Sequence, residues 1–426
     1  MSPISKTLTT NVTELSDPTL LAIKKRIYLA VVLAAEKAVA HLDNPTAFPL
    51  PDDKRALEHI MLDRLRTRPP LQQERARAYF KNIAATTPRR RARMLGKLSR
   101  VDLRSAEPVL SQAQRLVAGD AVLRTQSLSN LLPLGPVFTN HSAPAAIEMN
   151  LEPLASSTGG QFAETQTVLS EDRLVKWQEI AEKLHLFDLP NPLDDIDLDF
   201  VKPWKQLRLR IHTTNCIDET DGFLGTESGD DEIRLGGYLT DPTGTMTKAN
   251  LINLGDSFDD GEVVNYSPPR IFGTHVIKDE SIIIDGEKVD IKWPRSYFAT
   301  LILSEADNGG FPDFLDKVLA KIKDWVKGEV IAAVAAGIGA SIGSVGGPLG
   351  AAIGAAIGAI LGLIIDELIH VFKSIWEDDV FSAVTVAQQL AIPMPAWGVP
   401  HSPQGWVWWK GHGGHYKVWY DWEMIP

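Results

Sequence analysis

The sequence predicts an α+β protein of several domains, in which an α-helical N-terminal domain precedes an antiparallel β-sandwich that carries an inserted helical hairpin. In the first 118 residues, apolar side chains recur at helical spacing. From Leu207 onward, apolar and polar residues alternate, which is the period of a half-buried strand. Between two groups of such strands, residues 330–365 contain no charged side chain and are rich in glycine and alanine. This run predicts the inserted hairpin.

The chain divides into two parts of opposite charge. Its 426 residues have a net charge of −11. Residues 1–125 hold 22 lysines and arginines against 12 acidic residues, a net of +10, so the remainder holds 21 against 42, a net of −21. This asymmetry predicts two domains with different partners, or two halves that attract each other.

Cysteine content and the first residues predict where the protein is made. Cys216 is the single cysteine, which excludes an intramolecular disulfide. The first residues are polar, and the short apolar run at 27–35 lies too far into the chain to be a signal-peptide core. We therefore expect a protein made in the cytoplasm without a signal peptide, which acts at a target membrane after delivery by an injection machine or by lysis.

The N-terminal domain, residues 1–125, is expected to be entirely α-helical. Asp17 followed by Pro18 places a helix N-cap before a proline at the first helical position. Prolines and polar turn residues divide the rest of this domain into separate helices. Helical segments are expected near 18–42, 52–67, 70–84, 88–100 and 106–118.

A basic patch comes after the third of these helices. It consists of Arg89, Arg90, Arg91, Arg93, Lys97 and Arg100. Clustered basic groups bind nucleic-acid phosphates, acidic lipid headgroups or an acidic protein groove. Aromatic residues are not interleaved with the basic ones, so nucleic acid is disfavoured as a partner, and an acidic protein is the partner we expect for this domain. The alternative is a solvated helix face.

Two segments separate this domain from the sandwich. Residues 126–168 are dominated by small and polar residues and predict a flexible connector. Residues 169–200 predict a helix that begins at Ser170, with an acidic loop after it. The sandwich is assigned to residues 201–310 plus 377–426, with its strands expected near 207–211, 232–240, 249–254, 262–266, 281–285, 288–293, 297–304, 380–390, 405–410 and 415–423.

Residues 311–376 are assigned to a helix and the hairpin insertion. The glycines recur at intervals of four residues, so each series leaves one helix face without side chains, where another helix can approach closely. A Gly-Gly-Pro sequence supplies the turn between the two arms. The residues predicted to insert into a membrane are Gly339, Gly343, Gly346, Gly347, Pro348, Gly350, Gly354, Gly358 and Gly362.

The two arms, near 330–344 and 349–365, would each be about 22–26 Å long, slightly short for a hydrocarbon core of about 30 Å. Asp366 and Glu367 come directly after the second arm, and carboxylates resist insertion less when protonated. The stretch resembles the Ala/Gly/Ile-rich insertion hairpin of pore-forming colicins. This resemblance covers the hairpin alone and implies membrane insertion, with an oligomer on the membrane as one assembly. The alternative is a hairpin buried within its own domain.

Two acidic loops are candidates for a metal site. Hard cations such as Ca²⁺ take six to eight oxygen ligands from flexible loops. The loops at 218–232 and 305–310 are similar to the calcium-binding loops of C2 domains, because each comes after a strand. This resemblance implies calcium as a cofactor, whereas ordinary acidic loops at strand ends are the alternative. The matching residues are Asp218, Asp221, Asp230, Asp231, Glu305 and Asp307.

The C-terminal segment is expected to form a β-hairpin with an aromatic surface. Its candidate residues are Trp406, Trp408, Trp419 and Trp422. Three interpretations stay open. The tryptophans could pack as a core against the sandwich, lie at a membrane interface, or stack on sugars.

These observations predict a membrane-active effector or toxin rather than an enzyme. We find no nucleophile elbow, phosphate-binding loop, complete dinucleotide fingerprint or His-Glu-x-x-His sequence in the chain. The predicted function is permeabilisation of a target membrane by the glycine-rich hairpin. The first alternative is a structural or adaptor protein of a large assembly, with the hairpin packed on a partner. The second is a sugar- or calcium-binding β-sandwich module.

Overall fold

The computed structural model describes residues 9–12, 18–118, 204–219, 232–284, 287–291, 293, 295–305, 311–338, 348–376, 380–390, 393, 399–411 and 414–426. The described helices and strands belong to one compact unit, which joins the first 141 residues to Lys205–Ile425. The connector predicted at 126–168 and the helix and loop predicted at 169–200 lie outside the described residues. The predicted domain boundaries therefore stay a prediction.

Most helices lie in the N-terminal part of the chain, as the periodicity predicts. The helices are α1 (Pro18–Asp43), α2 (Leu57–Arg66), α3 (Pro70–Ala84), α4 (Pro88–Leu95), α5 (Val109–Val117), α7 (Phe311–Ile338) and α8 (Pro348–Trp376), with a short 3-10 helix at Gly96–Arg100. The last residues of the segment predicted at 88–100 form that 3-10 helix, because Gly96 ends α4 with a φ of +57°.

Helix α1 is the centre of the helical part. It contacts α2, α3 and α5 as well as α7 and α8. This placement explains why residues 30–35 are buried all around the helix instead of along one stripe. Lys37 and Glu58 are fully buried, with the ammonium 3.5 Å from a carboxylate oxygen. The pair joins α1 to α2.

The strands form two larger antiparallel sheets and a separate hairpin. The first sheet has the order β1-β10-β9-β3-β4, with β5 also paired to β3, and the second has the order β11-β12-β2-β6. The strands of the first sheet are β1 (Thr9–Val12), β3 (Ile233–Thr240), β4 (Met246–Lys248), β5 (Ile252–Gly255), β9 (Arg295–Glu305) and β10 (Val384–Leu390). The other strands are β2 (Gln206–Asp218), β6 (Val263–Val276), β7 (Ser281–Ile284), β8 (Glu287–Asp290), β11 (Gly405–Gly411) and β12 (Gly414–Ile425).

The two larger sheets meet through buried aromatic side chains. The His275 ring of β6 contacts the rings of Tyr297 on β9 and Trp422 on β12. Its centroid lies 5.1 Å from that of Tyr297 and 6.1 Å from that of Trp422. Tyr266 of β6 donates a hydrogen bond to the Leu254 carbonyl of β5. On β2, Leu207, Leu209 and Ile211 are buried while their neighbours are half-buried, which is the predicted alternation.

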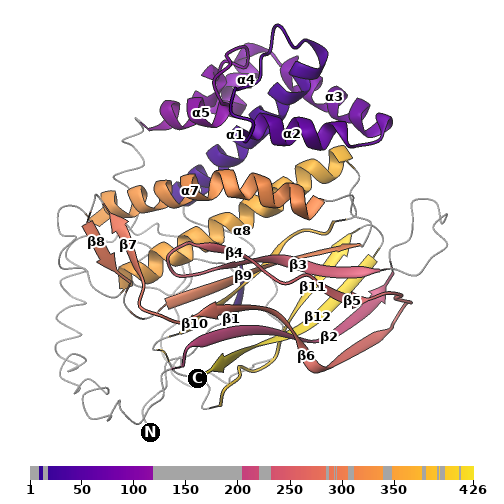
Figure 1. Ribbon diagram of the computed structural model, residues 1–426, viewed down its shortest axis with the longest axis vertical. Helices are drawn as coiled ribbons and strands as arrows, with labels where there is room; N and C mark the ends of the chain where they lie inside the picture. Colours follow the sequence, from indigo (N-terminus) through magenta and orange to yellow (C-terminus); the bar gives the residue numbers. More distant parts are fainter. Residues whose placement is uncertain are drawn as a thin grey trace, which may run out of the picture. The chain divides into compact units, whose positions relative to one another are not determined.

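The hairpin helices lie between the N-terminal helices and the first sheet (Figure 1). Helix α8 contacts β9 and β10 of that sheet, and α1 contacts both α7 and α8. Strands that come after α8 in the chain enter both larger sheets. The α+β layout is therefore confirmed, with helices mostly N-terminal and antiparallel sheets in the C-terminal half.

Candidate functional site: the glycine-rich hairpin and its surroundings

Helices α7 and α8 pack against each other as the two arms of a hairpin. Phe314 in the first turn of α7 meets Phe372 near the end of α8, with ring centroids 5.2 Å apart and nearly perpendicular rings. The start of one helix therefore lies beside the end of the other, and the arms run antiparallel. Their shared core includes Leu315, Ile322, Val326, Ile364, Leu368 and Ile369, all of which are buried.

The glycines of α8 that the structure describes in full face the first sheet. A Cβ atom at Gly358 would lie 2.4 Å from the ring of Phe298 on β9, and one at Gly362 would lie 2.2 Å from the hydroxyl of Thr385 on β10. Real Cβ atoms do not approach so closely, so only glycine allows α8 to lie this near the sheet. The four-residue glycine spacing does create a close approach here, but to a sheet rather than to the expected helix.

The remaining predicted insertion residues are described in part or not at all. Pro348 begins α8, as a proline at the first helical position should, and Gly350 and Gly354 lie within the first two turns. The other four, Gly339, Gly343, Gly346 and Gly347, lie outside the described residues. In the part of the chain that the structure covers, none of the helices combines the length and the apolar character needed to cross a membrane.

Helices α1 and α3 lie over the hairpin, and we call them the helical cover. Helix α1 contacts both arms, and α3 contacts α8. Two ion pairs join α1 to the hairpin: Lys24 lies 2.8 Å from Glu367 of α8, and Arg26 lies 3.4 Å from Glu329 of α7. Each ion pair has at least one largely buried partner. The described part of α8 thus lies between the first sheet on one side and the helical cover on another, with α7 packed beside it.

The acidic end of the hairpin is bound to the segment just before β10. Asp366 accepts a hydrogen bond from the Ala383 backbone N–H at 3.1 Å. Burial raises the pKa of the Asp366 carboxyl, while the neighbouring His370 opposes that rise. The carboxyl that is predicted to resist insertion is therefore already partly desolvated, and its protonated form is favoured relative to an exposed aspartate.

The predicted calcium site cannot be assembled from the described residues. Asp218 is exposed at the end of β2, opposite His415 of β12, and the backbone of Glu305 ends β9. The four other candidates, Asp221, Asp230, Asp231 and Asp307, lie outside the described residues. Among the residues that are described, we find no group of three or more side chains suited to hold a metal ion. Calcium binding stays a prediction.

The basic patch is partly used inside the fold. Arg91 points toward α1 and pairs with the buried Glu36 at 2.9 Å. The desolvation of Glu36 raises its pKa, and Arg91 counteracts that rise. The remaining residues of the patch are exposed on α4 and the 3-10 helix, namely Arg89, Arg90, Arg93, Lys97 and Arg100. Arg91 thus holds α4 against α1, and the other five residues leave a basic surface.

The C-terminal tryptophans divide between the two faces of the second sheet. Trp422 is fully buried beneath the sheet and stacks on His275, so it is not part of an aromatic surface. Trp408 is 42 % exposed, and Trp406 and Trp419 are directly opposite each other on β11 and β12. The Lys417 ammonium lies over both of their rings, 4.2 Å and 4.5 Å from the centroids. The aromatic surface therefore comprises three tryptophans and one lysine.

A buried polar cluster near the start of β9 is absent from the sequence-based predictions. Glu280 is buried, and neither of its carboxylate oxygens has a hydrogen-bond partner within the described part of the chain. Its desolvation raises its pKa to about 7. Nearby, the Arg295 guanidinium stacks on Trp293 and donates to the Ile291 and Lys278 carbonyls. Local periodicity carries no signal for such a cluster, because it depends on how distant segments meet.

Comparisons of the chain with protein families, with curated proteins and with solved structures found no match.

Proposed function

We propose that this chain is a membrane-active, non-enzymatic effector whose α7–α8 hairpin is held in a sheltered form and inserts into a target membrane when the helical cover moves away. The observation that carries the proposal is the enclosure of α8. Most of its apolar residues from Ala356 to Phe372 are buried in the core that it shares with α1, α3 and α7, and Gly358 and Gly362 lie against the sheet. A hairpin that must stay away from lipid until it is released requires such an enclosure.

The contacts between the helical cover and the hairpin suggest how release occurs. Lys24 and Arg26 supply the cations of both ion pairs, so an anionic lipid surface competes with Glu367 and Glu329 for the same side chains. The net charge of +10 in residues 1–125 draws this part of the chain toward such a surface. We therefore infer that anionic lipid is the trigger as well as the target.

The length of the apolar arms determines the form of insertion. Their charge-free parts extend about 22–26 Å, against a hydrocarbon core of about 30 Å. A hairpin of this length thins the bilayer locally or lies partly in the interface, rather than forming two full spans. Such insertion perturbs the bilayer and releases small solutes.

A cross-link between α1 and α8 tests the proposal. Lys24→Cys and Glu367→Cys place two thiols where the ion pair was, and a short bismaleimide joins them. The single native cysteine, Cys216, is buried and does not compete for the reagent. The assay is dye release from vesicles of phosphatidylcholine and phosphatidylglycerol. We expect the cross-linked protein to release little dye, and the unlinked double variant to release at least as much as the wild type.

The matched control joins two strands of one sheet instead. Thr213 and Asn265 face each other on β2 and β6, with their side-chain oxygens 2.9 Å apart. Thr213→Cys with Asn265→Cys, cross-linked in the same way, should release dye like the wild type. Equal release by both cross-linked proteins would show that separation of α1 from α8 is not needed, and the proposed mechanism would fail.

A second candidate is a structural or adaptor protein in which the hairpin is a permanent core. The close fit of Gly358 on Phe298 and of Gly362 on Thr385 favours it, because a helix that must leave its sheet gains nothing from such packing. Vesicles that stay sealed with the wild type and with the unlinked double variant at pH 7 and at pH 5 would favour this candidate.

A further inference from the structure

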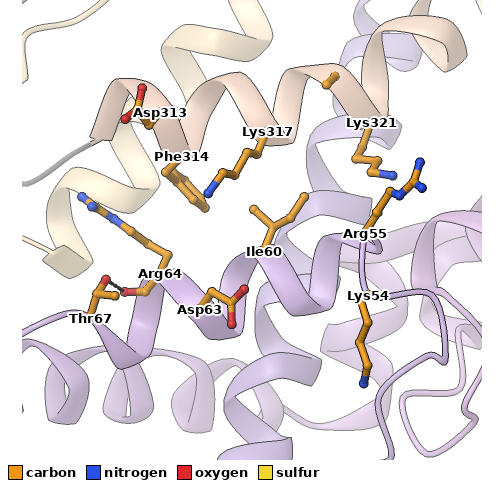
Figure 2. A pocket seen from close by; sticks show the side chains of 11 residues that line it. Lys54, Arg55, Ile60, Asp63, Arg64, Thr67, Asp313, Phe314, Lys317 and Lys321 are labelled. Carbon is orange, nitrogen blue, oxygen red and sulfur yellow. Dashed lines mark hydrogen bonds between the residues drawn. The ribbon is translucent and has the colours of Figure 1, made fainter.

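A groove of about 510 Å³ separates α2 from α7. One wall comes from α2 and the residues just before it, and the other comes from the first half of α7 (Figure 2). The groove lies within the range of about 300–1,000 Å³ that is typical of small-molecule sites. Ile60, Phe314 and Ala320 provide its apolar surface.

Basic side chains dominate the lining of the groove. Lys54, Arg55, Arg64, Lys317 and Lys321 line it, against the two acidic residues Asp63 and Asp313. One of those acidic residues is already engaged, because Asp313 lies 3.6 Å from the Lys248 ammonium. Figure 2 shows Arg55 and Arg64 extending from the α2 side toward α7, while Lys317 and Lys321 extend from α7 into the groove.

Three of these cations line the groove without intramolecular counter-ions of their own. Within the described part of the chain, Arg55, Lys317 and Lys321 form no ion pair, although Asp316 of the same helix α7 pairs with Lys248. Like charges that face each other across a narrow groove repel, and a bound anion removes that repulsion. Arg64 is largely buried and lies over the Phe314 ring, 5.8 Å from its centroid, so a fourth cation of the groove is held in place.

We propose that this groove binds a multiply phosphorylated small molecule or lipid headgroup. Phosphate groups match the site because arginine guanidinium groups bind their oxygens in pairs, while lysines act as point charges around them. The cations stand on both walls, so a ligand with a single phosphate cannot reach all of them, and one with several phosphates can. The apolar surface accommodates the ring or carbon frame that carries the phosphates.

Binding would join α2 to the first arm of the hairpin. A ligand that contacts both Arg55 and Lys321 stabilises the enclosed arrangement by mass action. If the hairpin is released as proposed above, a soluble ligand of this class retards that release, and this one consequence rests on the proposed function. The binding site itself does not depend on membrane activity, so the two ideas can fail separately.

The test uses the full chain and two kinds of probe at fixed ionic strength. Titration calorimetry with myo-inositol hexakisphosphate measures binding of a free phosphorylated molecule. Sedimentation with phosphatidylcholine vesicles, with and without a bisphosphorylated phosphoinositide, measures binding to a headgroup. Lys317→Gln with Lys321→Gln removes two cations of the groove. The matched control, Lys323→Gln with Lys327→Gln, removes two lysines of the same helix that do not line it.

We expect binding of at least one probe, with a Kd that rises about tenfold or more in the groove variant because two charge-assisted contacts are lost. The control variant should change the Kd by less than about twofold, because Lys323 and Lys327 are half-buried outside the lining of the groove and charges at a distance contribute little. Thermal unfolding of both variants without ligand reports whether each is folded. Absence of binding by either probe, or an equal loss of affinity in both variants, would overturn the proposal.

Discussion

Gly358 offers a quantitative test of why α8 is rich in glycine. In the structure, a Cβ atom at this position would lie 2.4 Å from the buried ring of Phe298. Forcing an extra methyl group into a packed core costs typically about 1–3 kcal/mol. Alanine also favours a helix over glycine by about 1 kcal/mol. The net loss in the free energy of unfolding expected for Gly358→Ala is therefore about 0–2 kcal/mol.

Gly328 of α7 separates the two effects. It lies in the same hairpin, but a Cβ atom there would meet nothing within 4 Å. Gly328→Ala gains the helix-propensity term without the clash, so it should stabilise the protein by about 1 kcal/mol. Because the propensity term is common to both variants, the difference between them isolates the clash, which we expect to be about 1–3 kcal/mol.

The assay is urea unfolding of the wild type and both variants, monitored by circular dichroism and tryptophan fluorescence. Coincident transitions of the two signals would justify comparing free energies. Gly358→Ala should unfold at a lower urea concentration than Gly328→Ala, with an unchanged slope. Equal stability of the two alanine variants would refute the argument, because the glycine would then have no packing role against the sheet.

Three further outcomes are expected. Glu58→Ala should lower the free energy of unfolding by about 3–5 kcal/mol in urea titrations, because it leaves the fully buried Lys37 without its carboxylate; replacing both residues by apolar ones should cost less. Desolvation raises the pKa of Glu280 from 4.5 to about 7, so the folded state holds this proton more tightly and stability should fall as pH rises through that range; Glu280→Gln should flatten the dependence, and an unchanged pH profile would contradict it. Burial lowers the pKa of His275 from 6.5 to about 4, so stability should fall as pH drops below 6.5; an imidazole that titrates near 6.5 in NMR spectra of the folded protein would exclude this.

The sequence predicts the elements of this fold well where the hydrophobic period is regular. Helices α1 and α3 begin at the predicted prolines, and the alternation on β2 is reproduced in the burial of its side chains. The hydrophobic period does not predict the length of β6, which is expected near 262–266 but runs from Val263 to Val276. Two prolines, Pro268 and Pro269, lie inside this strand, and proline is a reason to end a strand in sequence-based reasoning. A strand near the N terminus, β1, is too short for its period to be recognised.

The candidate site is less predictable because its neighbours come from distant parts of the chain. Four-residue glycine spacing predicts a smooth helix face, but it does not say whether a helix, a sheet or lipid lies on it. In the structure, Gly358 of α8 lies against Phe298, and Phe298 belongs to β9, a strand that precedes both arms of the hairpin. The ion pairs of Lys24 and Arg26 join residues that are 343 and 303 positions apart. No local pattern contains such information, and the groove between α2 and α7 escapes sequence analysis for the same reason.

The release of α8 into lipid is the central claim, and a fluorescent probe on that helix tests it most directly. Leu363 is half-buried on α8, so Leu363→Cys accepts an environment-sensitive dye with little disturbance of the core. A control dye at Leu251, which is exposed between β4 and β5, reports on the first sheet. On anionic vesicles with nitroxide-labelled acyl chains, we expect the Leu363 probe to shift to shorter wavelength and to be quenched, while the Leu251 probe is not. A Leu363 probe that keeps its emission and escapes quenching while the protein is bound to vesicles would contradict release of the hairpin.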